Sequence, residues 1–317
     1  MPIPSMSQVH VQAALSDLSI AYRQDAPAFS DLIFPRVSVN KQANKYFIWN
    51  KGDMWRNEAR KRAPAADFAR VGIRLSQDNY SCDQYALEYL IADEISSNAD
   101  AGVDIESTAT MYLVDQLNMQ KDLSFAADFL TSSSGWGSGT VSTAWDTVAT
   151  GTPVTNITTA VLAVRRALGA SAQHDIIGIG GTKILNALIN SDQVRDRTKY
   201  VKDGTYQGLR AALAPVLNLD RLIISEREYN TAAEGLTPSY SPVFNRQFLV
   251  VAVPRSPGLS VPSAGYTFAW DEGGRGDMYV EQYREEAKKS DVVRAVCYYD
   301  QKQTGTDLGI YFDTPVT

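Results

Sequence analysis

The segment from Ile177 to Lys183 places glycines between an apolar run and a helical pattern, which is where many proteins bind phosphate groups. A dinucleotide-binding fingerprint that starts at Gly178 requires a third glycine at the position of Lys183. A P-loop requires a glycine directly before its lysine, whereas Thr182 precedes this one. Both fingerprints fail, so the segment predicts a tight strand-to-helix turn and not a nucleotide site.

Histidine and cysteine are too scarce to build a familiar reactive centre. The two histidines, His10 and His174, lie far apart in the chain, so a Ser/His/Asp triad or a multi-histidine metal site has little material. We expect His174 to lie in a turn. The two cysteines, Cys82 and Cys297, are also far apart, which predicts two reduced, buried thiols and neither a disulfide framework nor a zinc site.

Carboxylates leave one catalytic alternative open. The 36 acidic residues always allow some Asp/Glu pair for general acid and base work, so a carboxylate-pair hydrolase stays an alternative. No particular pair is marked out by its spacing. The sequence therefore predicts no catalytic, cofactor-binding or metal-binding residue.

Charge is unevenly distributed along the chain. The overall charge of -6 argues against a dedicated nucleic-acid binder. The segment from Lys51 to Arg74 contains seven basic and three acidic residues, whereas the segment from Asp83 to Asp122 contains nine acids and one lysine. The two segments are either two solvated faces or surfaces that dock on each other, within or between chains. For docking between chains, the candidate contact residues are the basic Arg56, Arg60, Lys61 and Arg62 and the acidic Asp93, Glu94, Asp104 and Glu106.

The composition, with 44% hydrophobic and 21% charged residues in 317, is that of a folded chain with two domains or one elaborated one. The longest apolar run, Phe248 to Val253, is far shorter than the roughly 20 residues of a membrane span. The first basic residue is Arg23, so no signal peptide is visible and we expect synthesis and folding in the cytosol.

The first third of the chain predicts two extended features. Four prolines and one weak helical pattern in residues 1–39 predict an extended arm. The aromatic run from Tyr46 to Trp49 and the alternation of Val71, Ile73 and Leu75 predict a long two-stranded hairpin with a basic tip. Such a ribbon is only marginally stable alone, so it should lie on something else.

The remainder predicts an α+β domain and long closing strands. Apolar residues three and four apart, without Gly or Pro, predict a long helix over 104–130. Helices over 156–170, 182–190 and 206–214, the last ending before Pro215, and strands over 175–179, 222–224 and 248–253 follow. Residues 278–312 alternate as long strands, with these positions facing inward: Val280, Tyr283, Val293, Ala295, Cys297 and Tyr299.

In this order of elements the sequence resembles a major capsid protein of tailed bacteriophages, whose shell fold is shared with the herpesvirus capsid floor. The resemblance covers nearly the whole chain. It is carried by the segments Ala26 to Pro35, Tyr46 to Trp49, Leu185 to Ile189 continuing into Arg197 to Tyr200, and Glu281 to Phe312.

The resemblance implies an α+β fold with an N-terminal arm (1–44), an E-loop hairpin (45–76) and a P-domain (77–155) with the spine helix 104–130. An axial A-domain (156–265) and closing strands that return to the P-domain (266–317) complete it. In that family the E-loop lies across a neighbouring subunit, which would bring the basic loop over acids of another copy.

The resemblance further implies a non-enzymatic protein that assembles with itself, as pentamers and hexamers, into an icosahedral virion shell around double-stranded DNA. Assembly would occur in the host bacterial cytoplasm, without a membrane and without cofactors. DNA would contact the inner face without sequence specificity. A portal and a separate scaffolding protein are expected partners, and a decoration protein is left open. The other virion alternative is a tail-tube subunit, which lacks so long a spine helix.

Overall fold

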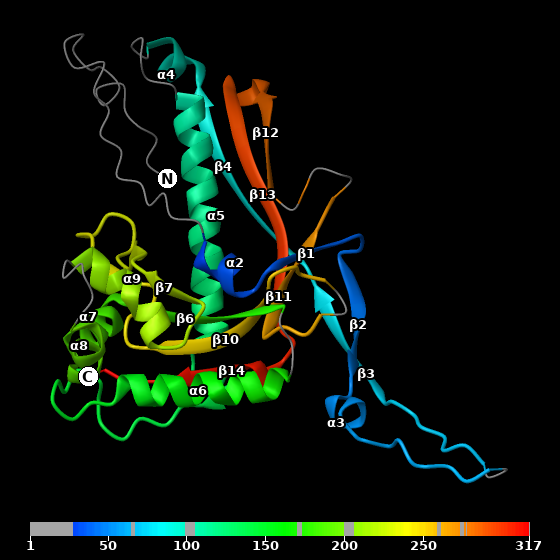
Figure 1. The fold of residues 1–317 in the computed structure, drawn as a ribbon. Helices are drawn as coiled ribbons and strands as arrows, with labels where there is room; N and C mark the ends of the chain where they lie inside the picture. The colour runs from blue at the N-terminus through cyan, green and yellow to red at the C-terminus, as the bar shows by residue number, and fades with distance from the viewer. Residues whose placement is uncertain are drawn as a thin grey trace.

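The computed structural model describes residues 28–64, 67–98, 105–169, 173–199, 206–258, 261–272, 276 and 278–316 (Figure 1). Most of the predicted arm, residues 1–27, and the candidate contact residue Asp104 lie outside the described residues. Within the described part, no helix is both long and apolar enough to cross a membrane.

The first sheet is built around one long strand. β13 (Ser290–Gln303) pairs on one side with β4 (Asp83–Ala92) and on the other with β12 (Met278–Glu285) and then β11 (Gly265–Trp270), all antiparallel. β1 (Arg36–Val39) joins β11 in parallel at the edge. Two short helices flank this sheet, α4 (Asp93–Asn98) after β4 and the 3₁₀ turn η1 (Glu286–Lys288) between β12 and β13.

The helix α5 (Ile105–Phe129) lies along this sheet (Figure 1). Its 25 residues give a length of about 37 Å at 1.5 Å per residue. Ala109, Leu113 and Leu117, each four positions apart, form one buried face. They pack on alternate residues of β13, which are Val293, Ala295, Cys297 and Tyr299. The helix predicted over 104–130 is confirmed.

Two of the six positions predicted to face inward are wrong. Val280 and Tyr283 are 40% and 38% exposed. The two residues are three positions apart on β12, so they lie on opposite faces of the strand and could not both point inward. Val280 pairs with Ala295 on the α5 side, but β12 is the edge strand beyond β13, whereas α5 packs on β13 and β4. Alternation indicates which residues share a face of a strand, but the position of the covering helix decides whether that face is buried.

The second sheet has the order β5-β14-β10-β6-β7. Its strands are β5 (Gly137–Ser138), β6 (His174–Gly181), β7 (Arg221–Ser225), β10 (Phe248–Pro254) and β14 (Gly309–Phe312). All seven residues of β10 are buried, which explains why its sequence is a continuous apolar run. The 3₁₀ turn η2 (Thr306–Leu308) precedes β14, and a separate small hairpin pairs β8 (Glu228–Asn230) with β9 (Tyr240–Pro242).

Four helices accompany the second sheet: α6 (Pro153–Leu168), α7 (Thr182–Asn190), α8 (Asp192–Thr198) and α9 (Tyr206–Val216). α6 begins three residues earlier than predicted because Pro153 takes the first helical position, where a missing N–H costs nothing. α9 continues past Ala214 and contains Pro215, contrary to the prediction. The proline lies in the last turn, and the Leu217 N–H still donates to the Leu213 carbonyl.

The described part of the predicted arm is not simply extended. It contains α2 (Phe29–Ile33), followed by β1. Phe29 and Phe34 pack edge-on against Phe125 of α5, with ring centroids 5.9 and 4.9 Å apart. This aromatic cluster fixes the segment onto the C-terminal half of α5.

Buried charges join the same segment to α5 and to the chain after β7. The Lys121 ammonium lies 2.5 Å from the Asp31 carboxylate. Asp122, which is fully buried, accepts a hydrogen bond from the Ser30 backbone N–H at 3.1 Å and lies 3.3 Å from the Arg227 guanidinium. Burial outweighs these contacts and raises the pKa of Asp122 to about 6.

The strand-to-helix turn predicted from Gly178 to Lys183 is confirmed as the junction of β6 and α7. A Cβ on Gly181 would lie 2.4 Å from the Asn245 Cα, so only glycine fits. The Asn245 side-chain oxygen accepts hydrogen bonds from the Lys183 backbone N–H and the Thr182 hydroxyl, at 3.0 and 3.1 Å. The start of α7 is therefore capped by the protein itself.

Asp122 makes stability depend on pH. Its folded pKa is above the unfolded value, so its contribution is largest below about pH 4 and is lost as pH rises through 6. Asp122→Asn cannot titrate. The difference in unfolding free energy between wild type and this variant should fall by up to about 3 kcal/mol from pH 4 to pH 7, measured by denaturant titration. Asp115→Asn, partly exposed and near the same arginine, is the control. Parallel pH curves for wild type and Asp122→Asn would contradict this account.

Gly181→Ala should destabilise the subunit by about 1–3 kcal/mol, because the new methyl group overlaps the Asn245 backbone. The matched control is Gly72→Ala, whose Cβ meets nothing within 4 Å and which should change stability by less than about 0.5 kcal/mol. Thermal melts measure both, and added ATP should leave the wild-type melting temperature unchanged. Equal melting temperatures for the two variants would show that the close approach at Gly181 is not a constraint.

Candidate assembly interface

The predicted hairpin is present as β2 (Ala43–Trp49) and β3 (Leu75–Ser81), paired antiparallel over seven residues. Its base packs on the first sheet through aromatic rings. Tyr80 stacks on Phe268 with centroids 4.6 Å apart, and Tyr46 lies 5.2 Å from the same ring. Residues of one face of the hairpin therefore bind it to the body of the molecule.

The two legs of the hairpin are tied together just beyond the strands. The first leg turns through α3 (Lys51–Met54), which the Asn50 side chain caps. Asp53 of this turn receives hydrogen bonds from the Arg74 side chain of the second leg at 2.8 and 3.0 Å. These bonds lower the pKa of Asp53 to about 2.

The described residues between Trp55 and Leu75 form a loop that extends away from the body (Figure 1). The predicted alternation at Val71 and Ile73 is not a strand, because pairing stops at Trp49 and Leu75. The loop nevertheless carries large apolar side chains in solvent. Phe68 is 76% exposed, Val71 65% and Ile73 51%. A single chain does not bury them.

The predicted basic contact residues all lie in this loop and are exposed. Arg56 pairs with Asp53 and Glu58 of its own loop, at 3.3 and 3.1 Å. The Arg62 guanidinium lies 4.1 Å above the Phe68 ring. Arg60 and Lys61 lie further along the first leg than Arg56, and both are exposed.

Of the predicted acidic contact residues that the structure describes, Asp93 and Glu94 lie in α4 and Glu106 lies at the start of α5, at the end of the molecule opposite to the loop in Figure 1. Asp93 is held by Arg284 of β12, whose two terminal nitrogens lie 2.5 and 2.6 Å from its oxygens, and this guanidinium lowers the Asp93 pKa. Glu94 and Glu106 are exposed. Among the ion pairs of the described residues, none joins the basic and acidic sets within one chain.

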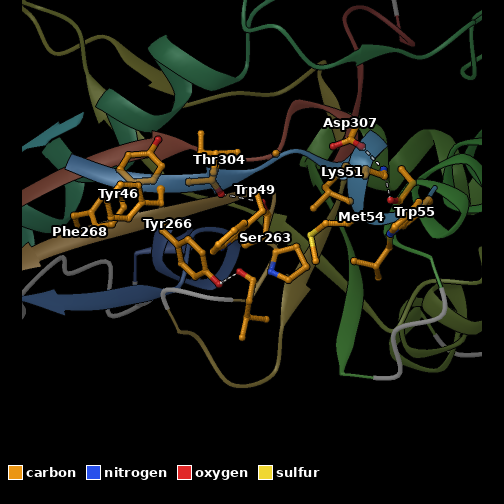
Figure 2. A pocket seen from close by; sticks show the side chains of 18 residues that line it. Tyr46, Trp49, Lys51, Met54, Trp55, Ser263, Tyr266, Phe268, Thr304 and Asp307 are labelled. Atoms are coloured by element: carbon orange, nitrogen blue, oxygen red, sulfur yellow. Dashed lines mark hydrogen bonds and ion pairs between the residues drawn. The ribbon is translucent and has the colours of Figure 1, made fainter. Parts of the chain in front are cut away.

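A cavity between the hairpin base and the body was not predicted. It has a volume of about 370 Å³ and a largely apolar lining, and Figure 2 shows its side chains converging from the hairpin and from the body. From the hairpin come Trp49, Met54 and Trp55, and from the body Leu168, Val261 and Leu308. The tryptophans that flank α3 were the available signal in the sequence.

The groups considered for chemistry are placed in structural roles. His174 is not in a turn: it begins β6 and lies buried, with its Nε2 2.7 Å from the Pro262 carbonyl oxygen. Cys82 and Cys297 are buried as predicted, and burial raises the pKa of the Cys82 thiol to about 12. In the part of the chain that the structure describes, no three His, Cys, Asp or Glu side chains are grouped to hold a metal.

Similarity to known proteins is visible in structure and not in sequence. No protein-family model and no curated protein matches this sequence. A phage-related protein from Bordetella bronchiseptica RB50 superposes with a TM-score of 0.68 at 18% identity, covering 93% of this chain and 95% of that chain. A chain from the capsid of cyanophage P-SCSP1u gives a TM-score of 0.60 at 14% identity, covering 98% and 94%.

The same fold also occurs outside phages. An encapsulin complex from Synechococcus elongatus PCC 7942 gives a TM-score of 0.56 at 9% identity, covering 100% of this chain and 96% of that chain. At these identities the superpositions establish the fold. With its projecting hairpin, long α5 and two five-stranded sheets, the chain has the α+β shell fold of the major capsid proteins of tailed phages.

Proposed function

We propose that this chain is the structural subunit of a phage head, in which many copies assemble into a closed icosahedral shell around double-stranded DNA. One observation carries the proposal. The loop beyond β2 and β3 exposes three large apolar side chains, Phe68, Val71 and Ile73, and apolar side chains gathered on one exposed segment are typical of an interaction site. Another copy of the chain, in a fold shared with phage capsids, is the partner that would cover it.

A contact made by a projecting loop would favour ring formation. A loop that projects from one copy onto a different surface of the next makes a head-to-tail contact, and such contacts repeat until a ring closes. Rings of five and six subunits are the units from which an icosahedral shell is built. The division into arm, E-loop, P-domain, A-domain and closing strands belongs to this proposal.

Charge would orient the docked loop. Of the basic residues, Arg60, Lys61 and Arg62 are proposed to contact acids of a neighbouring subunit, with Glu94 and Glu106 as exposed candidates. Arg56 and Asp93 would have to share their partners with the contacts they make within the chain. Asp104 belongs to the same acidic segment in the sequence.

The other classes of function are less well supported. A carboxylate-pair hydrolase needs two acids facing a cleft, but the cavity has a largely apolar lining and its Asp307 pairs with Lys51. A tail-tube subunit lacks a helix as long as α5. The proposal further includes a portal, a separate scaffolding protein, DNA on the inner face, and a place in the virion after assembly in the host cytoplasm.

Electron microscopy and analytical ultracentrifugation of the expressed chain test the proposal. We expect closed particles, formed alone or with the scaffolding protein of the same phage, and nuclease-resistant DNA in particles from infected cells. A monodisperse monomer under every condition, with scaffolding protein present, would contradict it. Open tubes would favour the tail-tube alternative, and particles that enclose protein cargo without DNA would indicate an encapsulin-like shell.

The charged contact predicts a defect in assembly and not in folding. Arg60→Glu with Arg62→Glu should leave the melting temperature nearly unchanged, because each exposed ion pair contributes only about 0.2–1 kcal/mol. The same change is repeated at every subunit contact of a shell, so sedimentation should show a shift from particles to free subunits or rings. High salt should weaken wild-type assembly in the same way.

The control for this variant is Arg166→Glu with Arg246→Glu, which changes the net charge equally at exposed positions outside the loop. It should assemble like wild type. If the loop variant also assembles normally at low salt, the basic residues are a solvated face and the docking proposal is wrong.

A further inference from the structure

The short helix α3 is bound to the body of the molecule where the loop leaves it (Figure 2). The Lys51 ammonium donates a hydrogen bond to the Ala167 carbonyl in the last turn of α6 and pairs with the Asp307 carboxylate. It also lies 4.6 Å from the centre of the Trp55 ring. A cation at the C-terminal end of a helix is favoured by the exposed carbonyl groups there.

Trp55 makes the second contact between α3 and the body. Its ring packs on Gly169, the residue that ends α6 with a φ of 77°. A Cβ at Gly169 would lie 2.7 Å from the Trp55 Cζ2 atom. Glycine is thus required twice here, for the backbone conformation and for the space that the tryptophan fills.

The returning leg of the loop is attached to the same helix. Asp53 receives hydrogen bonds from both the backbone N–H and the side chain of Arg74, and the Asn50 N–H donates to the Arg74 carbonyl at 3.1 Å. Both legs of the loop are therefore attached to α3 where they project from the body. Beyond it the described loop residues are exposed, with Glu58 half-buried.

We propose that α3 is a joint that fixes the direction of the loop in the free subunit, and that Lys51 and Trp55 are positioning residues for the contact between copies. A loop whose direction is already set loses less conformational freedom when it docks, so association is tighter for the same contacts. The joint itself is inferred from contacts within one chain. Its role in assembly rests on the proposed function.

The direction of the loop can be measured in the free subunit. Spin labels at Val71→Cys in the loop and Ala163→Cys on the exposed side of α6 report the distance between them by pulsed electron paramagnetic resonance. The native Cys82 and Cys297 are buried and should remain unlabelled. We expect a narrow distribution of distances in the otherwise wild-type chain and a broad one with Lys51→Ala or Gly169→Ala.

Two further variants separate positioning from general loss of structure. Lys51→Arg keeps a cation that can reach the carbonyl and Asp307, and should restore most of the narrow distribution. Lys45→Ala removes an exposed lysine of β2 and should change nothing. In assembly titrations followed by light scattering, Lys51→Ala should raise the concentration needed for particles by about tenfold, which corresponds to about 1.4 kcal/mol per contact.

Each outcome bears on one of the two proposals. An equally broad distribution in the wild-type background and in Lys51→Ala overturns the joint, whether or not particles form. A narrow distribution that Lys51→Ala broadens, with no change in the assembly concentration, overturns its role in assembly. A joint that behaves as expected in a chain that never forms particles supports the joint and contradicts the proposed function.

Discussion

The loop beyond β2 and β3 does not bury its apolar side chains in its own chain. The roles proposed for the other parts of the structure depend on this constraint. Burial of apolar surface contributes about 25 cal/mol per Å². The exposed Phe68, Val71 and Ile73 do not make that contribution to folding, and in the proposed assembly they would make it to association. The base of the hairpin differs, because its aromatic side chains Tyr46 and Tyr80 are packed on Phe268 of the body. One end of the hairpin is packed on the body, and in the proposed assembly the other end docks on another copy.

A projecting loop is useful for assembly only if the body that carries it is stiff. The long buried face of α5 on β13 and the fully buried strand β10 supply two packed cores. The aromatic cluster around Phe125 and the charges around Asp122 join α2, α5 and the chain near Arg227 into one unit. Lys51 and Trp55 connect the end of α6 to the base of the loop, and through the proposed joint they would set its direction. The position of the loop base thus depends on contacts that lead back to the packed cores.

The sequence was sufficient for features that depend on local spacing. α5 follows from apolar residues three and four apart, and the glycine turn before α7 follows from two failed fingerprints. The fold itself was reached through the order of elements. Features that depend on distant neighbours were not accessible: the exposure of Val280 on an edge strand, the pairing of Asp122 with Arg227, and the cavity under the hairpin. For the basic and acidic contact residues, a single chain shows where they lie and leaves the contact itself as a proposal.

The most direct measurement of the central claim is amide hydrogen exchange of loop residues 56–74 in purified particles and in free subunits under identical conditions. Exposed loop amides exchange rapidly in a free chain, and burial against another chain slows them. If the loop docks on a neighbouring copy, its amides should be strongly protected in particles and little protected in free subunits, with the amides of α5 protected in both. Equal, rapid exchange of the loop in particles and subunits would show that it does not form the contact between copies.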